Sequence, residues 1–374
     1  MGRSTGPRRP VEIASCSPPA RGVCVMREAV LWSTEDRGIR CGVCPHRCLI
    51  PEGHTGFCNV RENVGGTLVP LTYARVSSVA VDPIEKKPVF HYAPGTQVLS
   101  LGSVGCSMRC RHCQNWSISR ATPQDEAREL HDLLPTAVIS LAQQYGCPGV
   151  AFTYNEPIIQ IEYVMDVSRL AHEAGLFTVM VTNGYITSEA LDLLGELVDV
   201  WRVDLKGATD ESYAKLCRVP SPAPVREMAV RARHHWDMHV EVVTNVIPTI
   251  NDSEEDLRAM ARWVAEDLGT DTPWHVTRFF PYLELADLDP TPIETLHAAV
   301  RIGHEEGLRF VYLGNVASEG GENTVCPRCG ATAVKRAGYE VTRVKVRDGV
   351  CERCGEPLNI RIPGQGVRDR EHGV

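Results

Sequence analysis

Apolar, β-branched runs alternate with amphipathic stretches from residue 98 onward. Each run is long enough for one buried strand, and each amphipathic stretch for one helix. The predicted strands cover 98–104, 149–154, 177–181, 200–205, 240–247, 274–280 and 309–313. The predicted helices cover 131–145, 159–174, 188–198, 224–236, 254–268 and 292–306. Strands that alternate with helices predict an α/β fold with a parallel sheet, doubly wound or curled into a barrel, and periodicity does not distinguish the two.

The flanking segments differ in composition from this regular core. Residues 1–25 are rich in Pro, Gly, Ser and Arg without periodicity, which predicts a disordered extension, and Met26 is the expected true start. The remaining predicted segments are a Cys-rich N-terminal segment at 26–97, the core at 98–317, a linker at 318–325, a cysteine-bracketed module at 326–358 and a disordered tail at 359–374. The length of 374 residues fits one large domain with satellites, since single cores stop growing at roughly 250–300 residues.

Composition and charge exclude several classes of protein. The chain is 43% hydrophobic and 23% charged, as globular proteins are, and no apolar run approaches the roughly 18 residues of a membrane span. The net charge of −8 disfavours broad nucleic-acid binding, which uses a basic surface against phosphate. Residues 1–25 lack the apolar region of a secretory signal, so we expect a cytoplasmic protein.

Fifteen cysteines are the most unusual feature, and eleven of them fall into three clusters. Tight CxxC spacing in a cytosolic chain indicates metal binding rather than disulfides. The four scattered cysteines are interpreted as buried or disordered thiols without chemistry; they are Cys16, Cys24, Cys147 and Cys217.

The middle cluster, here called the central triad, consists of Cys106, Cys110 and Cys113 in the sequence CSMRCRHC, directly after the first predicted strand. Three thiolates are one short of the four that saturate a 4Fe-4S cluster, so one iron would stay open for another ligand. Functional sites of parallel α/β folds collect on loops after strands, which suits this position. The alternative is a zinc site completed by His112, although structural zinc usually uses four ligands in paired knuckles.

Polar groups follow the other predicted strands at the same edge. Five strand ends carry them: Asn155 with Glu156, Thr182 with Asn183, Asp204 with Lys206, Asn245, and Arg278. Strands that simply finish in polar turns would explain part of this set. They do not explain a carboxylate, a Lys and an Arg in apolar runs, where an unpaired charge is costly.

The C-x3-C-x2-C motif after the first core strand resembles the radical S-adenosylmethionine (SAM) superfamily over about residues 98–316. More closely, the chain resembles the radical enzyme of the AmmeMemoRadiSam system, which is related to pyruvate formate-lyase activating enzymes. That resemblance covers about residues 27–316 and is carried by CGVCPHRC, DPIEKKPVFHYAPG and GCSMRCRHCQNWSIS.

The resemblance implies a partial (β/α) barrel, a 4Fe-4S cluster whose open iron chelates the methionine part of SAM, and reductive cleavage of SAM to a 5′-deoxyadenosyl radical. Glu156 stands where the superfamily's Gly-Gly-Glu motif binds the methionine amino group, although Tyr154 and Asn155 replace the glycines. Arg278 suits the methionine carboxylate or a substrate anion, a bidentate role for guanidinium. The complete set of implied cofactor-binding residues is Glu156, Asn183, Asp204, Lys206, Arg278 and His112.

The C-terminal cluster, the ribbon quartet, consists of Cys326, Cys329, Cys351 and Cys354 in two CxxCG knuckles. Two such knuckles around a predicted hairpin are typical of a zinc ribbon with one structural zinc, and iron on the same ligands is the alternative. Its basic hairpin could bind RNA or an acidic protein, but a solvated strand face is the preferred interpretation.

The N-terminal quartet consists of Cys41, Cys44, Cys48 and Cys58, with His46 and His54 as substitute ligands. Its core resembles part of a ferredoxin run, yet the fourth cysteine lies ten residues further on. Zinc or a second iron–sulfur cluster are both candidates, and we favour zinc or a purely structural site at this stage.

The leading functional hypothesis is therefore a radical SAM enzyme that abstracts a hydrogen atom from an unknown substrate. The implied partners are an electron donor such as flavodoxin or ferredoxin, and proteins of the AMMECR and Memo types. An enzyme that activates a glycyl-radical partner is the alternative within the same chemistry. An interaction protein stabilised by zinc at all three clusters is the alternative from another class.

Overall fold

The computed structural model describes residues 27–125, 130–316 and 320–363. The predicted extension at 1–25 and the last eleven residues of the predicted tail lie outside these ranges. The chain forms two compact units, the first made of the residues up to Asp82 together with Gln97–Asp199, and the second of Pro83–Thr96 together with the residues from Val200 onward. The division falls inside the predicted core.

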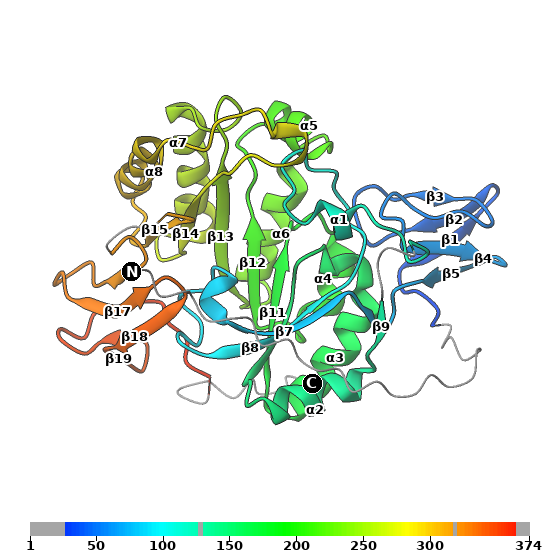
Figure 1. Ribbon diagram of the computed structural model, residues 1–374, viewed down its shortest axis with the longest axis horizontal. Helices are drawn as coiled ribbons and strands as arrows, with labels where there is room; N and C mark the ends of the chain where they lie inside the picture. Colours follow the sequence, from blue (N-terminus) through cyan, green and yellow to red (C-terminus); the bar gives the residue numbers. More distant parts are fainter. Residues whose placement is uncertain (1–26, 126–129, 317–319, 364–374) are drawn as a thin grey trace, which may run out of the picture. The chain divides into compact units, whose positions relative to one another are not determined.

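The first unit contains parallel strands with helices between them. Strand β8 pairs in parallel with β10, and β10 pairs in parallel with β11. Helix α3 packs on β10 and β11, as Figure 1 shows. The bounds are β7 Ser78–Pro83, β8 Gln97–Gly102, α1 Trp116–Ser119, α2 Pro135–Gln144, β10 Gly149–Phe152, a 3-10 turn η2 Pro157–Gln160, α3 Ile161–Glu173, β11 Phe177–Thr182 and α4 Ser188–Leu194. The predicted alternation of parallel strands and helices is confirmed here.

Short antiparallel strand pairs also lie in the first unit. Strand β2 pairs with both β1 and β3, β4 pairs with β5, and β6 pairs with β9. Arg61 on β4 forms a buried ion pair with Glu162 on α3, with N–O distances of 2.9 and 3.0 Å. The bounds are β1 Trp32–Glu35, β2 Gly38–Cys41, β3 Leu49–Ile50, β4 Arg61–Val64, β5 Thr67–Pro70, β6 Arg75–Val76 and β9 His131–Asp132. The ion pair fixes the Cys-rich segment to the sheet's helical layer.

The second unit continues the α/β pattern with strands β12, β13, β14 and β15, paired in parallel in that order. Helix α7 begins at a clear signal, since the Ser253 hydroxyl accepts the backbone N–H of Asp256 and three acidic residues occupy the first turn. The bounds are η1 Ile84–Lys86, β12 Val200–Asp204, α5 Asp210–Cys217, α6 Ala223–His234, β13 His239–Val246, α7 Glu254–Trp263, a π turn Val264–Leu268, β14 Trp274–Arg278, η4 Leu283–Leu285, α8 Ile293–Glu305 and β15 Val311–Gly314. Helix α5 was not predicted, because it is short and mostly polar.

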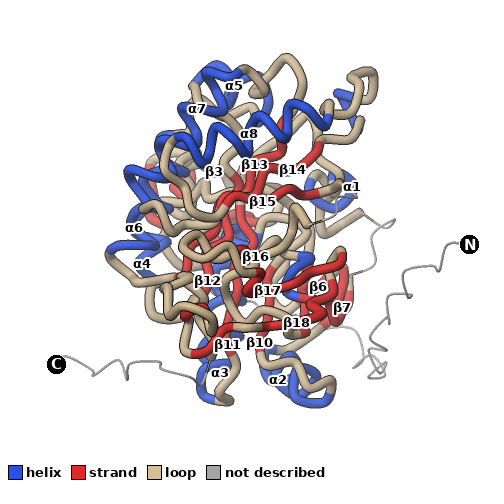
Figure 2. The backbone as a smooth tube through the Cα atoms, turned by 90° about the vertical axis from the view of Figure 1, so that its left-hand side faces the viewer, coloured by secondary structure: helices blue, strands red, loops and turns tan. Residues whose placement is uncertain are grey.

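The cysteine-bracketed module shares a core with the strands of the second unit. Strand β17 forms a hairpin with β18 and also pairs with β16, as Figure 2 shows. Phe90, Phe310 and Tyr312 pack in one apolar cluster with Val334 and Ile360. The bounds are β16 Thr324–Val325, β17 Thr332–Ala337, β18 Glu340–Val344, β19 Val346–Arg347 and β20 Val350–Cys351. The module is therefore integrated into this unit, because its apolar side chains complete the core beneath β15.

Two predicted boundaries differ from the structure around this module. Strand β16 lies within the predicted linker 318–325. The chain also does not fray directly after the module, since Ile360 is buried and the Arg361 backbone N–H donates to the His91 carbonyl at 2.8 Å. The Arg361 carbonyl also accepts the Ala93 backbone N–H at 2.9 Å. Apolar burial and these two backbone hydrogen bonds thus hold residues 359–363 in place, in contrast to the predicted tail.

A buried carboxylate organises the same core. Glu241 on β13 accepts the backbone N–H groups of Phe90 and His91 and the side chains of His239 and His275, at distances of 2.7 to 3.0 Å. These hydrogen bonds outweigh desolvation and hold the pKa of Glu241 well below its usual range, although burial alone would raise it. The charged carboxylate therefore links the DPIEKKPVFHYAPG segment to strands β13 and β14 through hydrogen bonds.

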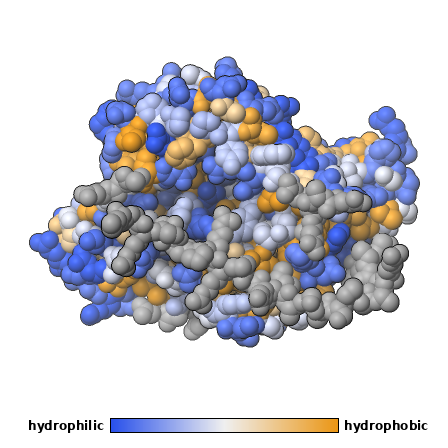
Figure 3. All heavy atoms as spheres, viewed as in Figure 1, coloured by the Kyte–Doolittle hydropathy of each residue, from blue (hydrophilic) through white to orange (hydrophobic). Residues whose placement is uncertain are grey.

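On the face drawn in Figure 3, hydrophobic residues form small patches separated by hydrophilic ones. The exposed large hydrophobic side chains of the described residues include Leu134 and Tyr339. None of the described helices has both the length and the apolar composition that a membrane crossing requires.

Candidate metal centre and cofactor site

The loop after β8 carries the central triad and is fixed to the next strand end. Asn155, which follows β10, accepts the backbone N–H of Ser103 at 2.9 Å. Its amide nitrogen donates to the carbonyl oxygens of Val104 and Gly105 at 3.1 and 3.2 Å. One buried side chain therefore sets the path of the loop into its first cysteine.

The residue before Asn155 has an unusual backbone. Tyr154 has a φ of 75°, in the left-handed region that favours glycine. Its hydroxyl donates to Asp82 at 2.5 Å, and its carbonyl accepts the side chain of Asn115 at 2.8 Å. The sequence departs from the superfamily's double glycine here, and the structure shows that the first of these positions adopts a conformation suited to glycine. The hydrogen bonds to Asp82 and from Asn115 hold Tyr154 in that conformation.

The thiols of the central triad suit a metal group by their chemistry. Burial raises the pKa of Cys106 well above its usual range, and the negative charges of Glu156 and Cys110 raise it further. The Met108 backbone N–H donates to the Cys106 sulfur at 3.3 Å, which favours a thiolate only weakly. A thiolate at this position thus needs a positive group such as iron, which the donor set of three soft sulfurs fits.

Glu156 connects the ends of β10 and β11. It is buried, and its carboxylate accepts the Thr182 hydroxyl at 2.6 Å, the Asn183 backbone N–H at 2.7 Å and the Ile158 backbone N–H at 3.2 Å. The last contact caps the 3-10 turn that precedes α3. Glu156 therefore positions the turn at Asn183, a role that the sequence did not indicate.

Asn183 brings this turn to the cysteine loop. Its amide nitrogen donates to the Ser107 hydroxyl at 3.1 Å and lies 3.6 Å from the Cys106 sulfur. Ser107 was missed by sequence reasoning, although its place directly after the first cysteine could have indicated it. The structure thus brings together the central triad, Glu156 and Asn183, and His112 is buried in the same loop.

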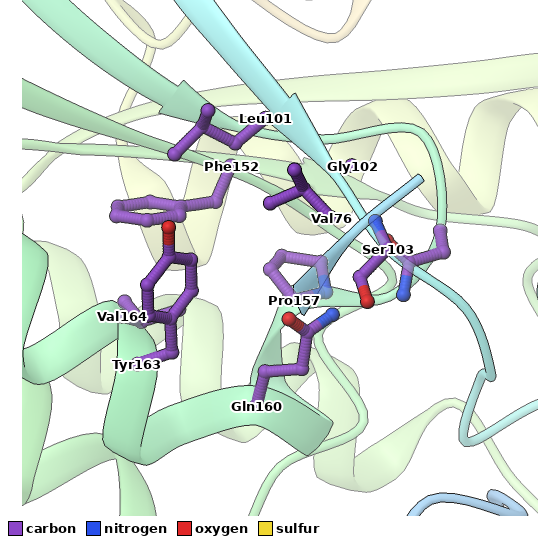
Figure 4. A pocket seen from close by; sticks show the side chains of 10 residues that line it. Val76, Leu101, Gly102, Ser103, Phe152, Pro157, Gln160, Tyr163 and Val164 are labelled. Atoms are coloured by element: carbon purple, nitrogen blue, oxygen red, sulfur yellow. The ribbon is translucent and has the colours of Figure 1, made fainter. Parts of the chain in front are cut away.

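A pocket lies behind the same loop, lined by Ser103, Asn155 and eight further residues. Figure 4 shows Pro157 and Gln160 close to Ser103, with Phe152 and Tyr163 to one side. Its free space of about 10 Å³ amounts to a single water position. The pocket therefore belongs to the packing of the loop and is too small for a substrate.

The other predicted cofactor residues lie in the second unit. Asp204 at the end of β12 accepts hydrogen bonds from Arg202 and from the Lys206 ammonium, the latter at 2.7 Å. Arg278 ends β14, and its guanidinium donates to the Thr291 carbonyl at 2.8 Å. The structure thus brings Asp204 and Lys206 together and gives Arg278 separate partners.

The ribbon quartet forms a compact four-thiol site. Its sulfur atoms all lie within 4.8 Å of one another, and the Cys326–Cys354 and Cys329–Cys351 sulfur distances are 3.5 and 3.8 Å. A tetrahedral ion with bonds of about 2.3 Å requires sulfurs roughly 3.8 Å apart. The quartet can therefore hold one metal ion.

The N-terminal quartet lies in the first unit, with Cys41 and Cys58 buried. Burial raises the pKa of Cys58 to about 11, with smaller contributions from neighbouring thiols. Burial likewise raises the pKa of Cys44, and Cys58 is the neighbouring thiol that adds most to this effect. The His46 Nε2 atom lies 2.8 Å from the Ser107 carbonyl oxygen, which accepts a hydrogen bond from the ring, so this ring contacts the triad loop.

The fold and the site together define a class: parallel α/β proteins with three cysteines on the loop after a sheet strand. The chain belongs to the radical SAM superfamily, whose family model matches residues 101–264. The predicted superfamily is thereby confirmed.

Two relatives and one solved structure are similar to this chain. It is 43% identical over 338 residues to an uncharacterized protein of Methanocaldococcus jannaschii, covering 90% of this chain and 99% of that protein. It is 28% identical over 175 residues to a pyruvate formate-lyase-activating enzyme of Listeria monocytogenes, covering 43% of this chain and 66% of that enzyme. A crystallised domain of a pyruvate-formate lyase-activating enzyme from Bacteroides vulgatus aligns with a TM-score of 0.39 and 19% identity over 45% of this chain and 99% of that one. The predicted relation to activating enzymes is confirmed at the level of sequence.

Proposed function

We propose that this protein is an enzyme that binds a 4Fe-4S cluster through the central triad and SAM at the cluster's open iron. The chemistry supplied by a cluster held there would be one-electron reduction of the SAM sulfonium, with the electron coming from a donor such as flavodoxin or ferredoxin; SAM would split into methionine and a 5′-deoxyadenosyl radical able to take a hydrogen atom from the substrate. The observation that carries this proposal is the meeting of the triad loop with Glu156 and Asn183 at adjacent strand ends.

In this proposal, the chain's own residues orient the methionine part of SAM. Glu156 holds the Asn183 turn against the triad loop and supplies negative charge near the methionine ammonium. For the second unit, the superfamily resemblance alone supports cofactor-binding roles, a positive charge at Lys206 and Arg278 and a hydroxyl acceptor at Asp204. His112 takes the place beside the adenine that the superfamily gives to an aromatic residue.

A second candidate function uses the same radical chemistry on a partner protein. The relation to pyruvate formate-lyase-activating enzymes supports hydrogen abstraction from a backbone glycine of a glycyl-radical protein. The AmmeMemoRadiSam resemblance instead supports partners of the AMMECR and Memo types, a cytoplasmic location and the superfamily's partial barrel. Membership in a superfamily of enzymes counts against a protein that only binds zinc.

The ribbon quartet completes the proposal as a structural zinc site. Its sulfur spacing matches one tetrahedral ion, and its apolar neighbours join the core of the second unit. Zinc bound there would add folding free energy to the hairpin β17–β18, whose second strand is largely exposed.

The test is anaerobic reconstitution with iron and sulfide, followed by incubation with SAM and a one-electron reductant. We expect 5′-deoxyadenosine to form, and we expect its loss when all three triad cysteines are changed to Ala. The matched control changes the scattered buried thiols Cys147 and Cys217 to Ala and should retain the product. Absence of both the product and a SAM-sensitive paramagnetic signal in the wild-type protein overturns the proposal.

A further inference from the structure

The N-terminal quartet surrounds one cavity in the first unit. All four of its cysteines line this cavity, together with Val43, Ile50, Phe57, Ile159 and Arg61, and with Gly56. Cys41 and Cys58 are buried, and Cys44 and Cys48 are partly buried. Cys58 lies ten residues after Cys48 in the sequence, but the fold places it at the same cavity as the three cysteines of the CxxCPHxC run.

The spacing of the sulfurs distinguishes this site from the ribbon. Within residues 27–125, 130–316 and 320–363, the ribbon quartet is the one group of three or more His, Cys, Asp or Glu side chains whose ligand atoms gather closely enough for a single ion. The sulfurs of the N-terminal quartet and of the central triad are therefore spread more widely. A cubane cluster requires this wider spread, because each thiolate binds a different iron.

We propose that the N-terminal quartet binds a second iron–sulfur cluster of the 4Fe-4S type. Four thiolates saturate such a cluster, so this centre has no open iron and does not bind SAM. Zinc or a structural site was favoured from the sequence because spacing along the chain does not reveal distances between sulfurs. The wide, cavity-lining arrangement in the fold favours a cluster instead.

The surroundings of the cavity match a buried anionic cluster. Its lining is mostly apolar, and the buried Arg61 guanidinium, which is paired with Glu162, also lines the cavity. The Phe57 backbone N–H donates to the Cys48 sulfur at 3.4 Å, which stabilises a thiolate. Hydrogen bonds of this kind also occur at zinc sites, so the sulfur spread carries the choice between the two metals.

The proposed second cluster lies next to the triad loop within the same unit. Gly105 has a φ of +86°, and a Cβ atom there would lie 2.6 Å from the Cys58 carbonyl oxygen. The Arg109 guanidinium donates to the Phe57 carbonyl and, at 2.9 Å, to the Cys106 carbonyl. The backbones that carry Cys58 and Cys106 are thus in direct contact, which makes the second cluster an adjacent redox centre.

The test measures iron, sulfide and zinc in the full-length protein after anaerobic reconstitution. Replacing the three triad cysteines with Ala should lower iron and sulfide about twofold, because one of two clusters of about four irons each remains. The remaining cluster should give a paramagnetic signal after reduction that SAM does not alter. Zinc should stay at one per chain, bound by the ribbon quartet.

Two results for the triad variant overturn the proposal. If the variant contains no iron but two zinc ions per chain, the N-terminal quartet is a zinc site. If it contains no iron and only the ribbon zinc, the four cysteines are structural thiols. The reciprocal variant Cys41→Ser/Cys44→Ser should keep a SAM-sensitive signal at half the wild-type iron, provided that circular dichroism shows a folded protein. The matched control Cys147→Ala/Cys217→Ala should keep all iron. A failure of SAM cleavage in the wild-type protein contradicts the proposed function only, since the triad variant tests the second cluster without SAM.

Discussion

Changing Glu156 to Gln tests how the strand ends organise the site. The buried carboxylate accepts three hydrogen bonds, from the Thr182 hydroxyl, the Asn183 N–H and the Ile158 N–H. Gln has nearly the same shape but replaces one acceptor oxygen with a donor nitrogen. The substitution therefore isolates charge and hydrogen bonding from packing.

The cost follows from the two orientations of the Gln amide. If its nitrogen faces Asn183, a backbone N–H at 2.7 Å loses its acceptor. If its nitrogen faces Ile158, that N–H loses its acceptor, Thr182 must reverse its hydroxyl, and the bond from Asn183 loses its charge. Each orientation removes about one charge-assisted hydrogen bond, so we expect unfolding free energy to fall by about 2 kcal/mol, within the 1.5–3 kcal/mol of such bonds.

The assay is urea denaturation together with SAM titration of the anaerobically reconstituted protein. We expect SAM affinity to fall about tenfold or more, since about 1.4 kcal/mol corresponds to a factor of ten. The cluster itself should still assemble, because the cysteines are unchanged. The exposed Glu173 at the end of α3 provides the matched control, and its change to Gln should leave stability within about 0.5 kcal/mol.

The result that refutes this reasoning is an unfolding free energy of Glu156→Gln within about 0.5 kcal/mol of wild type, because a buried carboxylate with three partners cannot be neutral to such a change. Loss of stability with unchanged SAM affinity would assign Glu156 to structure alone.

Three further predictions concern other parts of the chain. Arg61→Leu leaves Glu162 as an unpaired buried charge, so urea denaturation should show a loss of about 3–5 kcal/mol, and a loss under about 1 kcal/mol would contradict the role of this pair. Burial lowers the pKa of His91 to about 3, whereas the unfolded chain takes up this proton near pH 6.5. Stability should therefore fall as pH drops from about 6.5 toward 3, by up to about 1.4 kcal/mol per pH unit from this group. The slope between pH 6 and 4 should be shallower in His91→Gln than in the wild-type protein. Cys351→Ala should abolish the proposed zinc and expose the hairpin β17–β18 to protease while iron content stays constant, and retained zinc would count against the ribbon quartet.

Much of the fold could be read from periodicity, because each strand and helix buries its own apolar pattern. The strands predicted at 177–181 and 200–205 lie within one residue of β11 and β12. The prediction of a frayed tail was less successful, because the burial of Ile360 depends on Phe90 and Phe310, far away in sequence. Local composition near the end of the chain contains no sign of these partners.

The sequence by itself determined the three cysteine clusters, the parallel α/β pattern and the superfamily, since these depend on residue type and on spacing along the chain. Only the tertiary structure decided how the groups act on one another. It made Glu156 a positioning residue through its hydrogen bonds with Thr182 and Asn183. It also set the distances between sulfur atoms, which are short in the ribbon quartet and longer in the N-terminal quartet. The physical reason is that hydrogen bonding and metal choice depend on distances of a few ångströms between residues remote in sequence, and chain folding alone sets those distances.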